Sequence, residues 1–170
     1  MLDRHVLKPA GEGDPAKRHL DKITDEIKEE TAAAVREAEA SDRSDKEAAI
    51  RTLQHNQEAY MEAISKMDPA LAYSQKLGGR ATDGLLMRMA FTWLFEVTDG
   101  LLPLLQTSPT PPKAAVLLAF FAVLLHKAPN QWWQQGWSEH LIGRIYTLLD
   151  ETHRIWIRWP MEEMGWIPPS

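Results

Sequence analysis

Three histidines in the second half of the chain are the residues best suited to metal or acid–base chemistry. His126, His140 and His153 fall among apolar residues, and Glu139 and Glu151 lie near them in the sequence. A zinc site needs three or four such ligands at fixed geometry, and the spacings of 14 and 13 residues match no ligand pattern. We therefore expect no metal ion and no cofactor.

The sequence offers no recognisable catalytic residues. Glu162 and Glu163 are adjacent, so on a helix they point roughly 100° apart and form no carboxylate pair. Their place after Pro160 favours a role in stabilising a helix N-terminus. There is no phosphate-binding glycine loop and no nucleophile elbow, and the absence of cysteine excludes thiolate chemistry. These observations argue against an enzyme without excluding one.

Basic and aromatic residues alternate near the C-terminus, where Arg154 and Arg158 flank Trp156 and precede Trp159. Such a pattern can stack nucleic acid bases, or it can make cation–π contacts inside the protein. The net charge of the whole chain is −5, which is unfavourable for binding phosphates. We therefore favour intramolecular contacts, and we do not expect direct DNA binding.

Charge and tryptophan divide the chain into two unlike parts. Residues 1–68 hold 16 acidic and 11 basic side chains, whereas residues 69–170 hold eight of each. Six of the seven tryptophans lie between Trp132 and Trp166. Since buried aromatic and aliphatic area drives folding, the second part can build a core more readily than the first. We expect a charged, partly flexible helical arm over 1–68 and a Trp-rich helical globular domain over 69–170.

The helices follow from caps and apolar spacing, and no segment alternates as a strand would. Asp14 before a proline begins a helix that extends to Ala40, and Ser44 with Glu47 forms a capping box for the next. Asp68 before a proline predicts a further start, and Asp99–Gly100 predicts a turn. The fold class is therefore all-α, an irregular helical domain. We expect later helices over residues 69–77, 82–97, 113–127 and 131–149, then a new turn at 150–151 and a last short helix over 161–164.

An apolar seam on the second helix is the first candidate binding surface. Ile50, Leu53, Tyr60, Ile64 and Met67 are spaced by three, four or seven residues, which gives a heptad-like stripe of under three heptads. A seam this short either docks on the same chain or pairs with a second copy. We take the first four residues of the seam as candidate partner-binding residues.

The tryptophans are the second candidate surface. Seven tryptophans in 170 residues are difficult to bury completely in so small a domain. We expect some of them to form an exposed or partner-covered patch, since tryptophan is a favoured interface anchor. The candidates are Trp133, Trp137, Trp156 and Trp159.

The longest apolar run, Ala114 to Leu125, has twelve residues, fewer than the roughly 18 that a membrane-spanning helix needs. Lys113, His126 and Lys127 bound it, which favours a buried helix over a peripheral membrane contact. The first 14 residues hold no apolar run, so no secretory signal is expected. We expect an intracellular protein, nuclear or cytoplasmic, with no integral membrane insertion.

The segment from Leu117 to Pro168 resembles the end of the regulatory region of fungal zinc-cluster transcription factors. The resemblance lies in Trp132–Trp133, Gly136–Trp137, His140–Leu141, His153–Arg154, Trp156–Ile157, Trp159–Pro160 and Glu162–Glu163 with Gly165–Trp166. It implies a helical regulatory region without catalytic residues. That family binds DNA through six cysteines and two zinc ions, and this chain has no cysteine.

Two function hypotheses remain. The first is a non-enzymatic, transcription-related regulatory protein that acts through helix-mediated protein–protein contacts, including self-association. The alternative is a small helical enzyme or ligand-binding protein of secondary metabolism. In that alternative, Trp133, Trp137 and Trp156 would line a pocket, with His140 or His153 as acid–base groups.

Overall fold

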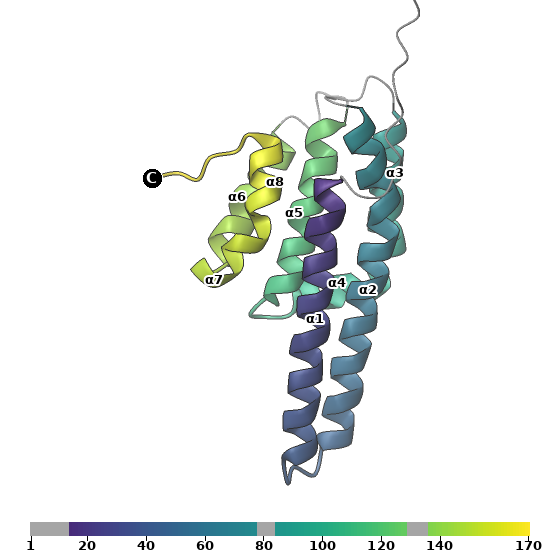
Figure 1. Cartoon of the computed structure of the whole chain (residues 1–170), viewed down its shortest axis with the longest axis vertical. Coiled ribbons are helices and arrows are strands. Elements are labelled where there is room, and N and C mark those ends of the chain that lie inside the picture. The colour runs from purple at the N-terminus through teal and green to yellow at the C-terminus, as the bar shows by residue number, and fades with distance from the viewer. Residues whose placement is uncertain (1–13, 78–83, 129–135) are drawn as a thin grey trace, which may run out of the picture.

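The computed structural model describes residues 14–77, 84–128 and 136–170 and shows an elongated helical assembly (Figure 1). Every regular element within these ranges is a helix, and none is a strand. The prediction of an all-α fold is therefore confirmed. No helix in the described part of the chain is both long and apolar enough to cross a membrane.

The helices α1 (Pro15–Ala40) and α2 (Lys46–Lys76) form a long antiparallel hairpin. Asp14 caps α1 as predicted, because its carboxylate accepts a hydrogen bond of 3.0 Å from the backbone N–H of Ala16. The predicted capping box on α2 is wrong. Its N-cap residue is Asp45, whose side chain makes no capping hydrogen bond and instead pairs with Arg43 in the turn at 2.8 Å.

Helix α2 continues through Pro69, so the predicted new start at Asp68 is wrong. An internal proline removes one helical hydrogen bond and strains the preceding turn. Continuity is favoured here because α2 buries one face on both sides of Pro69, with Met67 before it and Ala70 and Leu71 after it. The expected boundary at residue 68 therefore falls inside a single helix.

The helix α5 (Pro112–Lys127) lies at the centre of the assembly and is buried on nearly all sides, as predicted. Before it come α3 (Leu85–Glu96) and α4 (Thr98–Gln106), which meet at Val97. The predicted turn at Asp99–Gly100 is instead the first turn of α4. Gly100 lies against α2, where an added Cβ would come within 3.2 Å of the Ala59 Cβ, so this glycine permits close helix packing.

The C-terminal part wraps back over α5. It consists of α6 (Trp137–Leu148), α7 (Glu151–Arg154), the 3₁₀ helix η2 (Ile155–Ile157) and α8 (Arg158–Met164). Asp150 caps the predicted new turn by accepting a 2.9 Å hydrogen bond from the His153 N–H. Gly165 ends α8, as predicted, in a left-handed conformation with φ of 64°. The part of the predicted 131–149 helix before Gly136 lies outside the described residues.

One hydrophobic core joins both parts of the chain. Leu20, Ile23 and Ile27 of α1 belong to the same buried cluster as Phe120 of α5 and Trp159 of α8. The apolar residues of α1 are sparse, but their spacing of three and four places them on one face. Helix α5 is apolar all round and needs such a face to cover it. Residues of the predicted charged arm are thus part of the core.

Candidate interaction site

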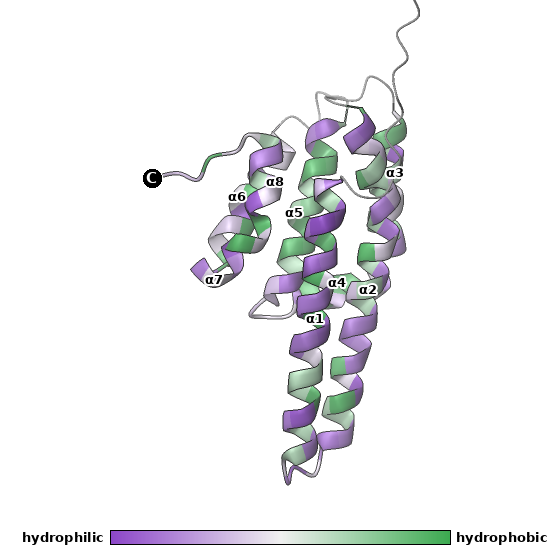
Figure 2. Ribbon diagram, in the orientation of Figure 1, coloured by the Kyte–Doolittle hydropathy of each residue, from purple (hydrophilic) through white to green (hydrophobic). Residues whose placement is uncertain are grey.

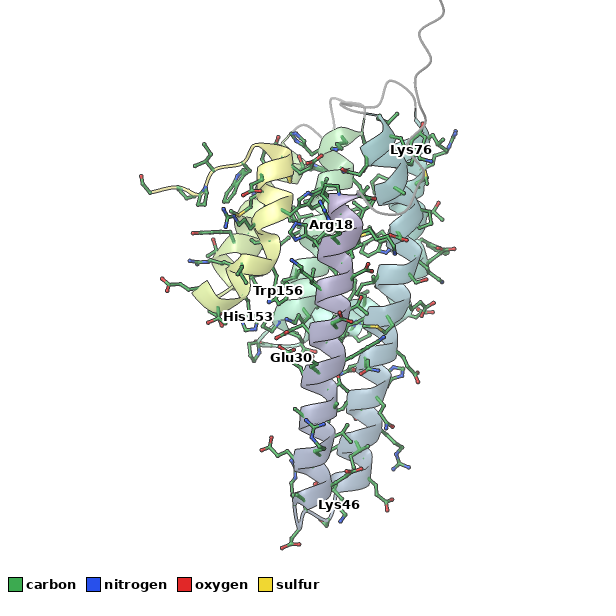
Figure 3. All side chains as sticks on the ribbon, in the orientation of Figure 1. Arg18, Glu30, Lys46, Lys76, His153 and Trp156 are labelled. Atoms are coloured by element: carbon green, nitrogen blue, oxygen red, sulfur yellow. The ribbon has the colours of Figure 1, made fainter. Side chains whose placement is uncertain are left out.

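The far half of the α1–α2 hairpin extends beyond the other helices, with Lys46 near its end (Figures 1 and 3). We call residues 31–58 the distal hairpin. Within this segment, all of which the structure describes, no residue is buried. The proximal half differs sharply, because α1 buries residues up to Ile27 and α2 buries residues from Ala59 onward.

The distal hairpin has an apolar seam that is only half covered. Val35 on α1 and Ile50 and Leu53 on α2 are half-buried, and Figure 2 shows hydrophobic residues on both helices of this segment. Each of these three side chains keeps part of its surface accessible to solvent. Six acidic and four basic side chains surround it. The segment therefore offers apolar area flanked by charges of both signs.

The structure separates the four predicted seam residues into two pairs. Ile50 and Leu53 lie on the distal hairpin, where they are half-buried. Tyr60 and Ile64 are buried in the shared core, so at this level the seam docks on the same chain. Self-association through the outer pair stays a prediction.

The predicted tryptophan patch is dispersed among different environments. Trp159 is buried and stacks on Phe120 with ring centroids 5.4 Å apart. Trp156 is half-buried beneath Lys113, while Trp137 is 48% exposed. Trp133 lies outside the described residues. Among the described members, Trp137 is thus the most accessible to another molecule.

Four residues from different elements meet where the distal hairpin leaves the core, and we call them the junction cluster: Glu30, Tyr60, Lys113 and Trp156. The Lys113 ammonium is buried, 3.6 Å from a Glu30 carboxylate oxygen and 4.5 Å from the centroid of the Trp156 ring. Glu30 and Trp156 come from facing elements (Figure 3). Burial, with a smaller contribution from the charge of Glu30, raises the pKa of Tyr60 to about 12.

The other end of α5 carries a matching anchor. Lys127 is buried and forms an ion pair with Glu163 of α8. Gln75 of α2 approaches the same carboxylate at 3.5 Å. In the sequence, both lysines were noted only as residues that bound the apolar run, and the structure shows that both are buried. Each ties α5 to a neighbouring helix through a carboxylate.

The candidate chemical groups are held in separate pairs. His126 Nδ1 lies 3.6 Å from Glu139, His153 Nδ1 lies 2.7 Å from Asp150, and His140 is exposed. No group of three potential metal ligands occurs in the described ranges. Glu162 pairs with Arg158 and Glu163 with Lys127, so the two carboxylates have different partners.

The cation–π contact expected for the C-terminal arginines is present, although its aromatic partner is different. Arg154 lies 4.1 Å from the centroid of the Tyr146 ring and donates a hydrogen bond of 3.1 Å to the Tyr146 carbonyl. These contacts join α7 to α6. They favour the structural interpretation of this arginine over base stacking.

Comparison with known proteins gives no match: no family model fits the sequence, and neither the curated proteins nor the solved structures contain a similar chain. The resemblance of residues 117–168 to a regulatory region therefore stays a prediction.

Proposed function

We propose that the protein is a non-enzymatic regulatory protein that acts through helix-mediated protein–protein contacts, and that the distal hairpin is its docking surface. One observation carries the proposal. Residues 31–58 form two paired helices that extend past the core, yet no residue among them is buried. A second surface laid against the open side of the seam would cover Ile50 and Leu53.

Binding of a partner would stabilise the distal hairpin. The distal parts of α1 and α2 continue helices of 26 and 31 residues, so they need no nucleation of their own, and their apolar residues are only partly covered by the pairing. Each Å² of apolar surface removed from water contributes roughly 25 cal/mol. The surrounding charges would select the partner and its orientation more than they would add affinity. The partner is a protein, either a different chain or a second copy.

The proposal extends to transcription through the resemblance of residues 117–168. In that role the distal hairpin would contact another regulator in the nucleus of a fungal cell, and the regulated genes would be those of secondary metabolism. Direct DNA binding is not part of the proposal, because the net charge of −5 opposes the approach of phosphates.

The test compares the wild-type chain with the paired variant Ile50→Ser/Leu53→Ser. Leu148→Ser is the matched control, because Leu148 is an exposed leucine on α6, outside the distal hairpin. Each protein is used as bait for affinity purification from the native cell, and its mass is measured by light scattering over a concentration series. Circular dichroism checks that every variant keeps its helix content.

We expect the wild type and Leu148→Ser to retain the same partner, or to self-associate equally, and the paired variant to lose at least 90% of that interaction. This follows from removing both large apolar side chains from the centre of the seam. A monomer that retains the same proteins with and without the paired substitution would contradict the proposal.

A further inference from the structure

The segment that follows α8 leaves the helical body in a direction that the fold sets (Figure 1). Gly165 is left-handed, and the Trp166 N–H donates a hydrogen bond of 2.9 Å to the Met161 carbonyl, which is a common glycine-based helix end. The Trp166 ring then packs on Tyr146 of α6, with ring centroids 5.6 Å apart. These contacts fix the point from which residues 167–170 extend, and we call those residues the proline segment.

The proline segment presents apolar side chains and a bare backbone to solvent. Its sequence is Ile167, Pro168, Pro169 and Ser170, without a charged residue. Ile167 is 83% exposed, Pro169 is exposed and Pro168 is half-buried. None of the four makes a hydrogen bond or an ion pair within the part of the chain that the structure describes.

Two consecutive prolines decide which partner can recognise this segment. Each proline fixes its own φ at about −65°, and a residue that precedes a proline avoids the α region, so Ile167 and Pro168 both favour the extended polyproline II conformation. A bound helix is therefore excluded. Addition to the edge of a partner's sheet is disfavoured, because Pro168 and Pro169 have no N–H to donate. Recognition by charge is excluded as well, which leaves a polyproline II helix in an aromatic-lined groove.

The other proline-rich stretch of the chain, residues 106–112, is used differently. Pro111 is the N-cap of α5 and Pro112 is its first residue, so both serve to begin the central helix. Pro109 is exposed, but it lies in a short connection that is held at both ends by α4 and α5. The proline segment is held at one end by Trp166, and its backbone is open to a partner.

We propose that the proline segment binds, as a polyproline II helix, in an uncharged aromatic-lined groove of a partner protein. Ile167 and Pro169 contact the aromatic rings of the groove, and Pro168 holds the conformation. Indole N–H or phenolic O–H groups of the groove donate hydrogen bonds to the carbonyls of the segment. Because the prolines preset the conformation, binding loses little chain entropy. This site is separate from the distal hairpin and does not depend on its docking role.

The experiment probes an array of purified SH3, WW and EVH1 domains with the full chain, and the affinity for each domain that binds is measured by isothermal titration calorimetry. The test variants are Ile167→Ala and Pro168→Ala/Pro169→Ala. The matched controls are Ile155→Ala, at an isoleucine of η2 that is 67% exposed, and Pro109→Ala, at the exposed proline of the other stretch. Circular dichroism checks that every variant keeps its helix content.

We expect the wild type to bind at least one of these domains. Ile167→Ala and Pro168→Ala/Pro169→Ala should each weaken that binding about tenfold or more, while the controls change it less than about twofold. Replacing the aromatic residues of the groove by alanine in the bound domain should abolish binding. The variant Ile50→Ser/Leu53→Ser should bind the domain as the wild type does, since the distal hairpin is a different surface.

Three results would overturn the proposal. The first is that no domain of the array binds the full chain at any concentration up to its solubility limit. The second is that binding withstands the double proline substitution or the loss of the aromatic residues of the groove. The third is that binding is lost in Pro109→Ala or in Ile50→Ser/Leu53→Ser and kept in the variants of the proline segment, which would place the site elsewhere.

Discussion

The two halves of the α1–α2 hairpin are made of the same two helices and yet differ in what covers them. In the proximal half, Leu20 and Ile23 of α1 and Met67 and Leu71 of α2 are almost completely buried, because the hairpin packs there against the other helices. In the distal half, Ile50 and Leu53 are half-buried, and among the described elements α1 is the helix that lies beside them. Both halves carry apolar residues at helical spacing, so the difference in burial comes from the other helices that pack against the proximal half.

The junction cluster marks where one half gives way to the other. Glu30 is the last residue of α1 before the distal hairpin, and Tyr60 is among the first buried residues of α2 after it. Between them the buried ammonium of Lys113 fixes the start of α5. The core thus ends at the buried Lys113, and beyond it no third element of the described ranges covers the seam of the hairpin.

The largest expected effect comes from removing the same side chain from each half. Ile23→Ala should destabilise the fold by about 2–5 kcal/mol, because Ile23 is fully buried in the core. Ile50→Ala should cost about 1 kcal/mol or less, since its side chain is already partly in water. Urea denaturation followed by circular dichroism measures both. Equal costs would show that the distal half is packed as tightly as the proximal half.

A smaller effect is expected at the junction cluster. Glu30→Gln should destabilise the protein by about 1–3 kcal/mol, because it leaves the buried Lys113 ammonium without its counter-charge. Adding Lys113→Met should recover much of that loss, since methionine places an apolar chain of similar length against Trp156. Urea denaturation of the wild type, the two single variants and the double variant gives a double-mutant cycle, which measures the coupling between Glu30 and Lys113. Glu29→Gln, on the exposed neighbouring residue, is the control and should change stability by less than about 0.5 kcal/mol.

If Glu30→Gln and Glu29→Gln proved equally harmless, the junction cluster would not anchor the hairpin. The boundary between the two halves would then be set by apolar packing alone.

The smallest expected effect is on the stability of the protein at alkaline pH, and it comes from Tyr60. Burial and the charge of Glu30 raise the pKa of Tyr60 from 10.0 to about 12, so the folded state holds the phenolic proton more tightly than the unfolded state. This contribution to stability is fully present below pH 10 and is lost as the pH rises from 10 to 12. Tyr60→Phe should therefore show a shallower loss of stability over that interval. Parallel stability profiles for the two proteins would contradict a protonated, buried Tyr60.

The sequence predicts much of the fold because local rules decide it. Asp14 and Gly165 act as the predicted cap and terminator, and the apolar run after Pro112 forms the buried central helix. The prediction at Pro69 is wrong because packing on both sides of this residue outweighs one lost hydrogen bond. A local sequence pattern does not show how much packing energy the residues on both sides of a proline gain in the folded protein.

The candidate site is less predictable, because it depends on which elements become neighbours. The seam itself is visible in the sequence. Leu53 is half-buried and Tyr60 is buried because the N-terminal end of α5, which is distant in the chain, lies near Tyr60 and not near Leu53. In the sequence, Lys113 is only a residue that bounds the apolar run, and its contacts with Glu30 and Trp156 come from elements far away in the chain.

The most direct test of the docking role is site-specific photo-crosslinking in the native cell. A photoreactive amino acid replaces Arg51, an exposed residue beside Ile50 on the distal hairpin, or Arg144, an exposed residue on α6. We predict an intermolecular product, with another protein or a second copy, from position 51 that is absent from position 144. Products from position 144 alone, or none from either position, would contradict a docking role for the distal hairpin.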